Sequence, residues 1–242
     1  MDSYVLIPKA LQAFSAQRKN LKDKQPQGRL LDLINMRYIG LSGVAGAGKD
    51  LFFSLLSKRA SCVRFSLADE LKLDVRQWCI DSYGVDPVTC PRDQKEIVRP
   101  FLVFHGMQKR NKTKGRYWID RLHSSIKVRE SKIEEAFHEF PILSLTEREK
   151  LNVITDIRYD EYDNDEVGWL KDELHGKLVH ITQYRDGVSK TPANEEEARN
   201  EPDLINKADY RIEWEYVKSG QTNQLMPHID NFVSWYKTVN EN

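Results

Sequence analysis

The sequence predicts an α/β protein with a mainly parallel sheet and helices on both faces. Short apolar runs typical of buried strands alternate with longer stretches of helical periodicity. A glycine-rich stretch, Gly43-Val-Ala-Gly-Ala-Gly-Lys49-Asp50, lies between a predicted strand over 38–42 and a predicted helix over 50–59. This strand–loop–helix order distinguishes a phosphate-binding loop of the form G-x-x-x-x-G-K from an accidental match.

The other core elements follow this loop in alternation. Strands are expected at 62–67, 152–156, 177–182 and 208–214. Helices are expected at 68–83, 94–109, 117–137, 162–174 and 226–239. Pro100 is expected to bend or restart the helix that contains it.

Three polar segments interrupt this pattern. Residues 1–36 are interpreted as an N-terminal extension with two short helices, over 6–14 and 30–34. Residues 109–116 hold five Lys or Arg in eight positions and are expected to form a basic loop. Residues 183–203 are poor in apolar side chains and are expected to be mobile.

Bulk properties exclude several classes of protein. The 242 residues carry a formal net charge of zero, which argues weakly against a nucleic-acid partner. No apolar run approaches the roughly 18 residues that would span a bilayer, so no membrane partner is expected. The three cysteines are odd in number and lack metal-ligand spacing, which fits a reducing compartment. A cytoplasmic location is therefore expected.

The glycine-rich stretch predicts the site for a phosphate-bearing ligand. Backbone N–H groups of such a turn point inward, and the next helix adds the positive end of its dipole. Lys49 would place an ammonium group on the outer phosphates. Asp50 stands where Ser or Thr is usual and would bring a carboxylate to Mg²⁺. The predicted binding residues are Gly43, Val44, Ala45, Gly46, Ala47, Gly48, Lys49, Asp50 and Leu51.

A second predicted functional group follows the strand over 152–156. Ligands collect outside the carboxyl ends of strands in open α/β sheets. Asp156 there is a candidate ligand for Mg²⁺, and Arg158 is a candidate partner for an anion. The structural alternative is an ion pair between Asp156 and either Arg158 or Glu161. The phosphate loop upstream favours the functional interpretation.

Four blocks of the sequence resemble the viral and bacterial deoxynucleoside monophosphate kinases of the P-loop kinase class. They are Gly43 to Asp50; Phe65-Ser-Leu-Ala-Asp69-Glu-Leu-Lys72; Arg99 through Gly106 and Arg110 to Trp118-Ile119; and Asp156-Ile-Arg158-Tyr159. The ordered set covers about residues 37–240 and is more specific than the phosphate loop alone. The resemblance implies a P-loop kinase-like three-layer sandwich over 37–242.

The resemblance also implies an activity and a distribution of roles. The donor would be ATP with Mg²⁺, and the acceptor a deoxynucleoside 5′-monophosphate that becomes the diphosphate. The acceptor region would span about 66–137 and a lid about 183–203, with Arg185 as a transition-state contact beside Lys49 and Arg158. Family members often form homodimers. The implied acceptor-binding residues are Asp69, Lys72, Arg99, Arg110, Trp118, Asp156 and Arg158.

The sequence departs from the family pattern at Leu51, Glu70 and Trp214, where the family has Thr, Pro and Asn. Two alternatives therefore stay open. The same scaffold could phosphorylate another acceptor: dephospho-coenzyme A, phosphomevalonate, or a hydroxymethylated pyrimidine, free or within DNA. The basic stretch 109–116 favours the DNA version. The chain could also bind a nucleotide without catalysing transfer.

Overall fold

The computed structural model describes residues 37–139 and 150–240 and contains a six-stranded sheet. The strands are β1 (Tyr38–Ser42), β2 (Cys62–Phe65), β3 (Leu151–Ile154), β4 (Lys177–Arg185), β5 (Val188–Ser189) and β6 (Tyr210–Glu215). Their order is β2-β3-β1-β4, with both β5 and β6 paired to β4. All pairings are parallel except the short β4–β5 hairpin. The carboxyl ends of β1, β2, β3, β4 and β6 therefore meet at one edge.

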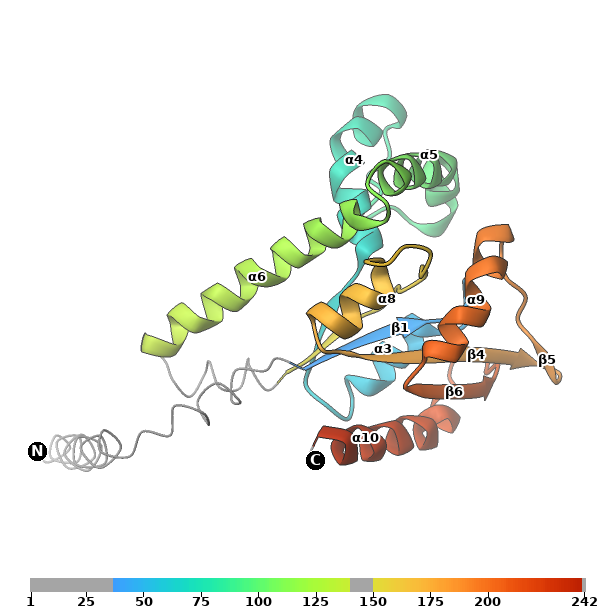
Figure 1. The fold of residues 1–242 in the computed structure, drawn as a ribbon. Helices are drawn as coiled ribbons and strands as arrows, with labels where there is room; N and C mark the ends of the chain where they lie inside the picture. The colour runs from blue at the N-terminus through green and yellow to red at the C-terminus, as the bar shows by residue number, and fades with distance from the viewer. Residues whose placement is uncertain (1–36, 140–149, 241–242) are drawn as a thin grey trace, which may run out of the picture. The chain divides into compact units, whose positions relative to one another are not determined.

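Helices connect these strands. They are α3 (Lys49–Leu56), α4 (Leu67–Tyr83), α5 (Arg92–Lys112), α6 (Arg116–Glu139), α8 (Glu166–Gly168), the π-helix η1 (Trp169–Glu173), α9 (Glu195–Lys207), the 3-10 helix η2 (Thr222–Leu225) and α10 (Met226–Asn240). Figure 1 shows α3 and α10 on one side of the sheet and α8 and α9 on the other. The predicted α/β class, with a mainly parallel sheet and helices on both faces, is confirmed.

Two apolar cores cover the two faces of the sheet. One joins β1, β3, β4 and β6 to α3 and α10, with Phe52 and Phe232 fully buried in edge-to-face contact. The other joins the opposite face to α6, η1 and α9, with Trp169 fully buried and Leu204 holding the second half of α9. Burial on both faces explains why the central strands appear in the sequence as continuous apolar runs.

A third and smaller cluster lies between α4 and α5, away from the sheet. Its buried residues are Val75, Cys79, Val85, Val98 and Leu102. Large apolar side chains of the same two helices remain exposed, among them Trp78, Ile97 and Phe104. These two helices extend from the sheet in Figure 1 and rest on a small core of their own.

Pro100 lies inside one continuous helix, because α5 runs from Arg92 to Lys112 while Val98 and Leu102 pack against α4 on either side of the proline. The helix does not restart at this residue, and the expected bend stays a prediction. The expectation of a basic loop over 109–116 is wrong, because this stretch is mostly helical. Residues up to Lys112 belong to α5, and only three residues separate them from α6 at Arg116.

The polar segment 183–203 has regular secondary structure over most of its length, and its mobility as a lid stays a prediction. Strand β4 continues to Arg185, the β5 hairpin follows, and α9 begins at Glu195. The side chain of Asn194 caps α9 by accepting a hydrogen bond from the Glu197 N–H at 2.9 Å. The expected helix over 162–174 begins later, at Glu166, where Asp165 caps it. The proposed extension 1–36 lies outside the described residues.

Candidate phosphate-binding site

The glycine-rich loop has a backbone that side chains would obstruct. Gly43 has φ 126° and Gly48 has φ 101°, in the left-handed region that favours glycine. A Cβ on Gly43 would lie 2.3 Å from the Ile181 carbonyl oxygen, and one on Gly48 would lie 2.8 Å from the Trp214 ring. Close packing on β4 and β6 therefore requires glycine at both positions.

Trp214 of β6 packs against this loop. Its indole N–H donates to the Ala47 carbonyl oxygen at 3.0 Å, and only 2% of the residue is exposed. Its ring also lies against Gly48 and near Phe52 of α3. The departure from the family pattern at this position thus places a structural residue beneath the loop.

Lys49 begins α3 and folds back over its own loop. Its Nζ donates to the carbonyl oxygens of Gly43 and of Val44, the latter at 3.1 Å. Burial lowers the pKa of Lys49 to about 8, and repulsion from Arg158 acts in the same direction. Attraction by Glu197, Asp156 and Glu201 opposes part of this shift. The ammonium group is therefore largely desolvated and lies within the field of a second cation.

The loop already binds an anion within the chain. Both carboxylate oxygens of Glu197, from α9, lie 3.2 Å from the Ala45 N–H, which donates to them. Lys190, from the segment before α9, lies beside Gly46, where its Cε would be 2.8 Å from an added Cβ. The first turn of α9 and the residues before it therefore contact the loop at Ala45 and Gly46.

Asp156 lies at the carboxyl end of β3 and is nearly buried. Its carboxylate accepts hydrogen bonds from the Ser66 hydroxyl at 2.9 Å, the Leu67 N–H at 2.9 Å and the Ala68 N–H at 2.7 Å. The N–H groups of Leu67 and Ala68 have no partner within α4 because they lie at its start, so Asp156 anchors that helix. Its role as a metal ligand stays a prediction.

Arg158 extends from the turn after β3, and its side chain is exposed. Within residues 37–139 and 150–240, no carboxylate lies within ion-pair distance of its guanidinium group. Its backbone N–H donates to Glu166 Oε2 at 2.6 Å, and the N–H of Tyr159 donates to the same oxygen at 3.2 Å. Burial and the neighbouring Asp165 raise the pKa of Glu166 to about 8. Glu166 thus fixes the turn that carries Arg158.

Arg64, at the end of β2, links the two halves of the predicted site. Its guanidinium group lies 3.8 Å from the Asp50 carboxylate and 2.5 Å from that of Asp69. Asp69 also pairs with Lys72 at 2.6 Å. The side chain of Asp50 is 86% exposed, so its carboxylate is accessible to a hydrated cation. The structure therefore places Asp50 and Asp69 on either side of one arginine.

Two predicted acceptor residues have structural contacts instead. Arg110 is 2% exposed, pairs with Asp165 at 2.5 Å and Glu161 at 3.0 Å, and stacks 3.9 Å from the centre of the Tyr159 ring. Trp118 is buried and donates its indole N–H to the Gly106 carbonyl oxygen. These contacts account for both side chains without a ligand, and their acceptor role stays a prediction.

The other two predicted arginines lie on the surface. Arg99 pairs with Glu96 on the same helix at 2.7 Å, where both side chains are about half exposed. Arg185 lies at the end of β4 with its guanidinium group 5.2 Å from the Tyr216 ring centre. Lys190 approaches the loop directly and was missed by sequence reasoning.

Sequence reasoning also missed Arg64, Glu166 and Glu197. One signal for Glu197 was present, because Asn194 followed three residues later by Glu197 is the pattern of a capping box at a helix start. It would have predicted α9. It would not have predicted that the same carboxylate reaches a loop about 150 positions earlier.

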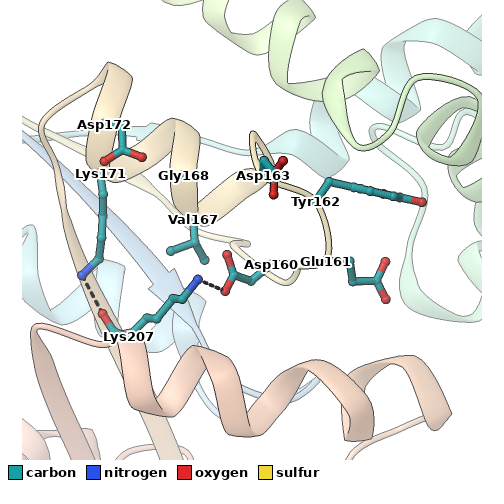
Figure 2. A pocket seen from close by; sticks show the side chains of 9 residues that line it. All are labelled: Asp160, Glu161, Tyr162, Asp163, Val167, Gly168, Lys171, Asp172 and Lys207. Atoms are coloured by element: carbon teal, nitrogen blue, oxygen red, sulfur yellow. Dashed lines mark hydrogen bonds and ion pairs between the residues drawn. The ribbon is translucent and has the colours of Figure 1, made fainter.

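A pocket of about 420 Å³ lies away from the phosphate loop, and Figure 2 shows the side chains that line it. They are Asp160, Glu161, Tyr162, Asp163, Val167, Gly168, Lys171, Asp172 and Lys207. Lys207 pairs with Asp160 across it. None of the predicted site residues lines this pocket, and its four carboxylates would repel a polyanion. We therefore place the candidate site at the loop.

Within residues 37–139 and 150–240, no group of three or more His, Cys, Asp or Glu side chains is arranged to hold a metal ion. No helix in that part of the chain is long and apolar enough to cross a membrane.

Comparisons with known proteins do not assign the chain to a family. No protein-family model matches it, and no curated protein sequence matches it. One similar solved structure is the dephospho-CoA kinase from Campylobacter jejuni, at 14% identity and a TM-score of 0.37 over 85% of this chain and 98% of that chain. A likeness at that level is too low to bear on fold or activity. The candidate function must therefore be argued from this chain's own residues.

Proposed function

We propose that this chain is a phosphotransferase that moves the γ-phosphoryl group of ATP onto the 5′-phosphate of a deoxynucleoside monophosphate. The observation that carries the proposal is the glycine loop, whose Ala45 N–H already donates to a carboxylate that lies in the field of the half-buried Lys49 ammonium. An N–H group of such a loop that donates to an anionic oxygen is a donor that a phosphate oxygen could use. The acceptor class comes from the resemblance in the four sequence blocks.

The cations at the carboxyl edge of the sheet suit the transfer of a charged group. In phosphoryl transfer, negative charge spreads over the oxygens of the transferring group, so catalysis is mostly positioning and electrostatic stabilisation. Lys49 would bind the donor phosphates, and Arg158 would contact the group in transit. Burial lowers the pKa of Lys49, and Arg158 lies close enough to lower it further by repulsion, which supports the convergence of the two cations on one anion.

Mg²⁺, when bound with the nucleotide, would bridge the donor phosphates and neutralise part of their charge. Asp50 fits that ion, because its carboxylate is exposed next to the loop and, among the described residues, pairs only with Arg64, at 3.8 Å. Without a cation, Asp50 would repel the phosphates. A strong Mg²⁺ requirement follows, and small protein ligand sets are usual where phosphates supply the other oxygens.

The acceptor region would lie between the end of β2 and the helices α4 and α5. Burial lowers the pKa of Lys95, and repulsion from Lys72 and Arg99 lowers it further, so three cations gather on that side. Asp69 neutralises part of this charge through Lys72 and Arg64. The remaining positive charge favours a phosphorylated acceptor. The homodimer implied by the resemblance stays a prediction.

The basic stretch 109–116 offers less support for a DNA substrate than its composition indicates. Arg110 is buried among carboxylates, and Arg116 pairs with Asp120 at 2.8 Å and with Glu173 at 2.5 Å. Lys109 lies over the Tyr117 ring. Since these contacts occupy much of the positive charge, a small phosphorylated acceptor is favoured over a polymer.

The test is a product assay with ATP, Mg²⁺ and each common ribo- and deoxynucleoside monophosphate, with dephospho-coenzyme A and phosphomevalonate in parallel. We expect diphosphate formation with at least one deoxynucleoside monophosphate and none without Mg²⁺. Turnover confined to another acceptor would replace the proposed substrate. ATP binding without transfer to any acceptor would make the chain a nucleotide-binding protein instead.

A further inference from the structure

We infer that Glu197 is an intramolecular competitor for the phosphate loop, so that a nucleotide binds only when the first half of α9 leaves the loop. The inference rests on the proposed function and concerns the regulation of the same site. Both Glu197 oxygens lie 3.2 Å from the Ala45 N–H, one of the donors that a phosphate would use. A carboxylate and a phosphate cannot accept from that N–H at the same place.

The contact is not a by-product of helix capping. Glu197 is the third residue of α9, and its Oε2 accepts from the N–H of Ala193, the residue just before the Asn194 cap, at 2.9 Å. That hydrogen bond requires one oxygen and no contact with the loop. Glu195 and Glu196 stand in the same first turn, yet only Glu197 reaches Ala45. The approach to the loop is therefore an additional feature of this side chain.

The charges around Glu197 favour its present position in the free protein. Its carboxylate raises the pKa of the desolvated Lys49 ammonium, so it offsets part of the cost of burying that cation. Bound polyphosphate would reverse this balance, because it attracts Lys49 and repels Glu197. The phosphate that the loop favours is thus the ligand that expels the glutamate.

The two halves of α9 are held by different kinds of contact. The second half is held by Leu204, which is buried in the apolar core with α6 and η1. The first half is attached by polar contacts: Glu197 to the loop, Glu201 at 3.2 Å from His180, and Asn200 to the turn at Glu161. Pro202 lies between the halves and removes one helical hydrogen bond. Polar contacts exchange for water more readily than apolar ones, so the first half can lift while Leu204 stays buried.

The experiment compares Glu197→Gln with Glu195→Gln in the full chain. A Gln side chain can still accept the hydrogen bond from the Ala193 N–H but carries no negative charge, so α9 remains intact. Glu195→Gln makes the same change two residues before Glu197, on an exposed side chain. Binding of ATP with Mg²⁺, and of inorganic tripolyphosphate, is measured by calorimetry. We expect Glu197→Gln to bind both about tenfold more tightly than the wild type, because the competent state is no longer diluted. Glu195→Gln should stay within about twofold.

A second measurement detects the contact without a ligand. Hydrogen exchange of the Ala45 and Ala193 amides should be slow in the wild type, and the Ala45 amide should exchange faster in Glu197→Gln. If wild type and Glu197→Gln bind ATP equally well, the competition is refuted while the proposed function stands. If neither protein binds ATP or tripolyphosphate, both proposals are overturned. Equal gains in Glu195→Gln and Glu197→Gln would reduce the effect to general electrostatics and refute a specific contact.

Discussion

The phosphate loop and the α4–α5 pair are supported by very different amounts of buried structure. The loop rests on the core between the sheet, α3 and α10, with Trp214 hydrogen-bonded directly beneath it. The α4–α5 pair rests on five buried residues and leaves Trp78 45% exposed. Local stability follows buried apolar contact, so the loop should be rigid and the helix pair should open at lower free energy. Under the proposed function, the loop that binds the donor is rigid and only the first half of α9 over it must move, whereas the acceptor side as a whole can move when a substrate binds.

The most direct test of this comparison removes the positive charge of Lys49 from the phosphate loop, which is the rigid region. Lys49→Ala should lower phosphoryl transfer by about 10²–10³-fold, because it removes a positioned, desolvated donor to the transferring group. Folding should persist, since the hydrogen bonds of Lys49 Nζ within the described part of the chain go to carbonyl oxygens of its own loop. Steady-state turnover and far-UV circular dichroism check both parts.

Lys58→Ala serves as the control for Lys49→Ala, because Lys58 is exposed just beyond the end of α3. It should leave turnover unchanged. Wild-type turnover in Lys49→Ala would remove the loop from the mechanism, and the contrast between the two regions would then have no bearing on catalysis.

The second comparison uses one tryptophan from each region. Trp214→Ala should reduce the free energy of unfolding by about 3–5 kcal/mol, because it leaves a cavity in the main core and an unpaired Ala47 carbonyl group. Trp78→Ala should cost about 1 kcal/mol, since its ring is nearly half exposed and stacks mainly on Phe101. Urea denaturation of both variants measures the difference. Equal losses would mean that the α4–α5 pair is as firmly packed as the loop.

The same contrast explains what could be predicted from the sequence. The loop and the central strands were predictable, because a glycine-rich turn between an apolar strand and a helix is a local pattern. The start of α9 was signalled only by its capping residues, Asn194 and Glu197, because one buried leucine and a set of polar contacts hold a segment with few apolar residues.

Individual roles at the site depended on partners that are distant in the chain. Asp156 anchors α4 through the N–H groups of Leu67 and Ala68, which lie almost 90 residues earlier. Arg110 is occupied by Asp165 and Glu161, about 50 residues later. A sequence shows that such charged residues are present, but their pairing appears only when the strands and helices are packed.

A third comparison uses one glycine from each region. Gly48→Ala should destabilise the protein by about 2–3 kcal/mol and weaken ATP binding, because the residue has φ 101° and a Cβ would meet Trp214 at 2.8 Å. Gly84→Ala, at the end of α4, should cost only about 1 kcal/mol, because φ is 65° and nothing lies within 4 Å of the new methyl group. Thermal unfolding and ATP calorimetry separate the two effects. Similar results for both glycines would show that the loop can shift away from Trp214.

The smallest expected effect is a pH dependence, and its two halves have opposite signs. The pKa of Lys49 is lowered to about 8, so the cation that would bind phosphate is lost as the pH rises through 8. ATP affinity should therefore fall about two- to threefold between pH 7.5 and 8.5, a range in which a terminal phosphate with a pKa near 6 is already ionised.

Stability should respond to Lys49 in the other direction. The folded protein loses this proton near pH 8 and the unfolded chain only near 10.5, so the unfolded state binds more protons in between. The contribution of Lys49 to the free energy of unfolding therefore rises from pH 8 towards 10.5. Lys49→Met should abolish this contribution and the pH dependence of any residual ATP binding, whereas Lys58→Met should leave both unchanged. If ATP affinity fell with pH in Lys49→Met as it does in the wild type, a group other than the Lys49 ammonium would control binding. The rigid side of the molecule would then contribute its backbone alone.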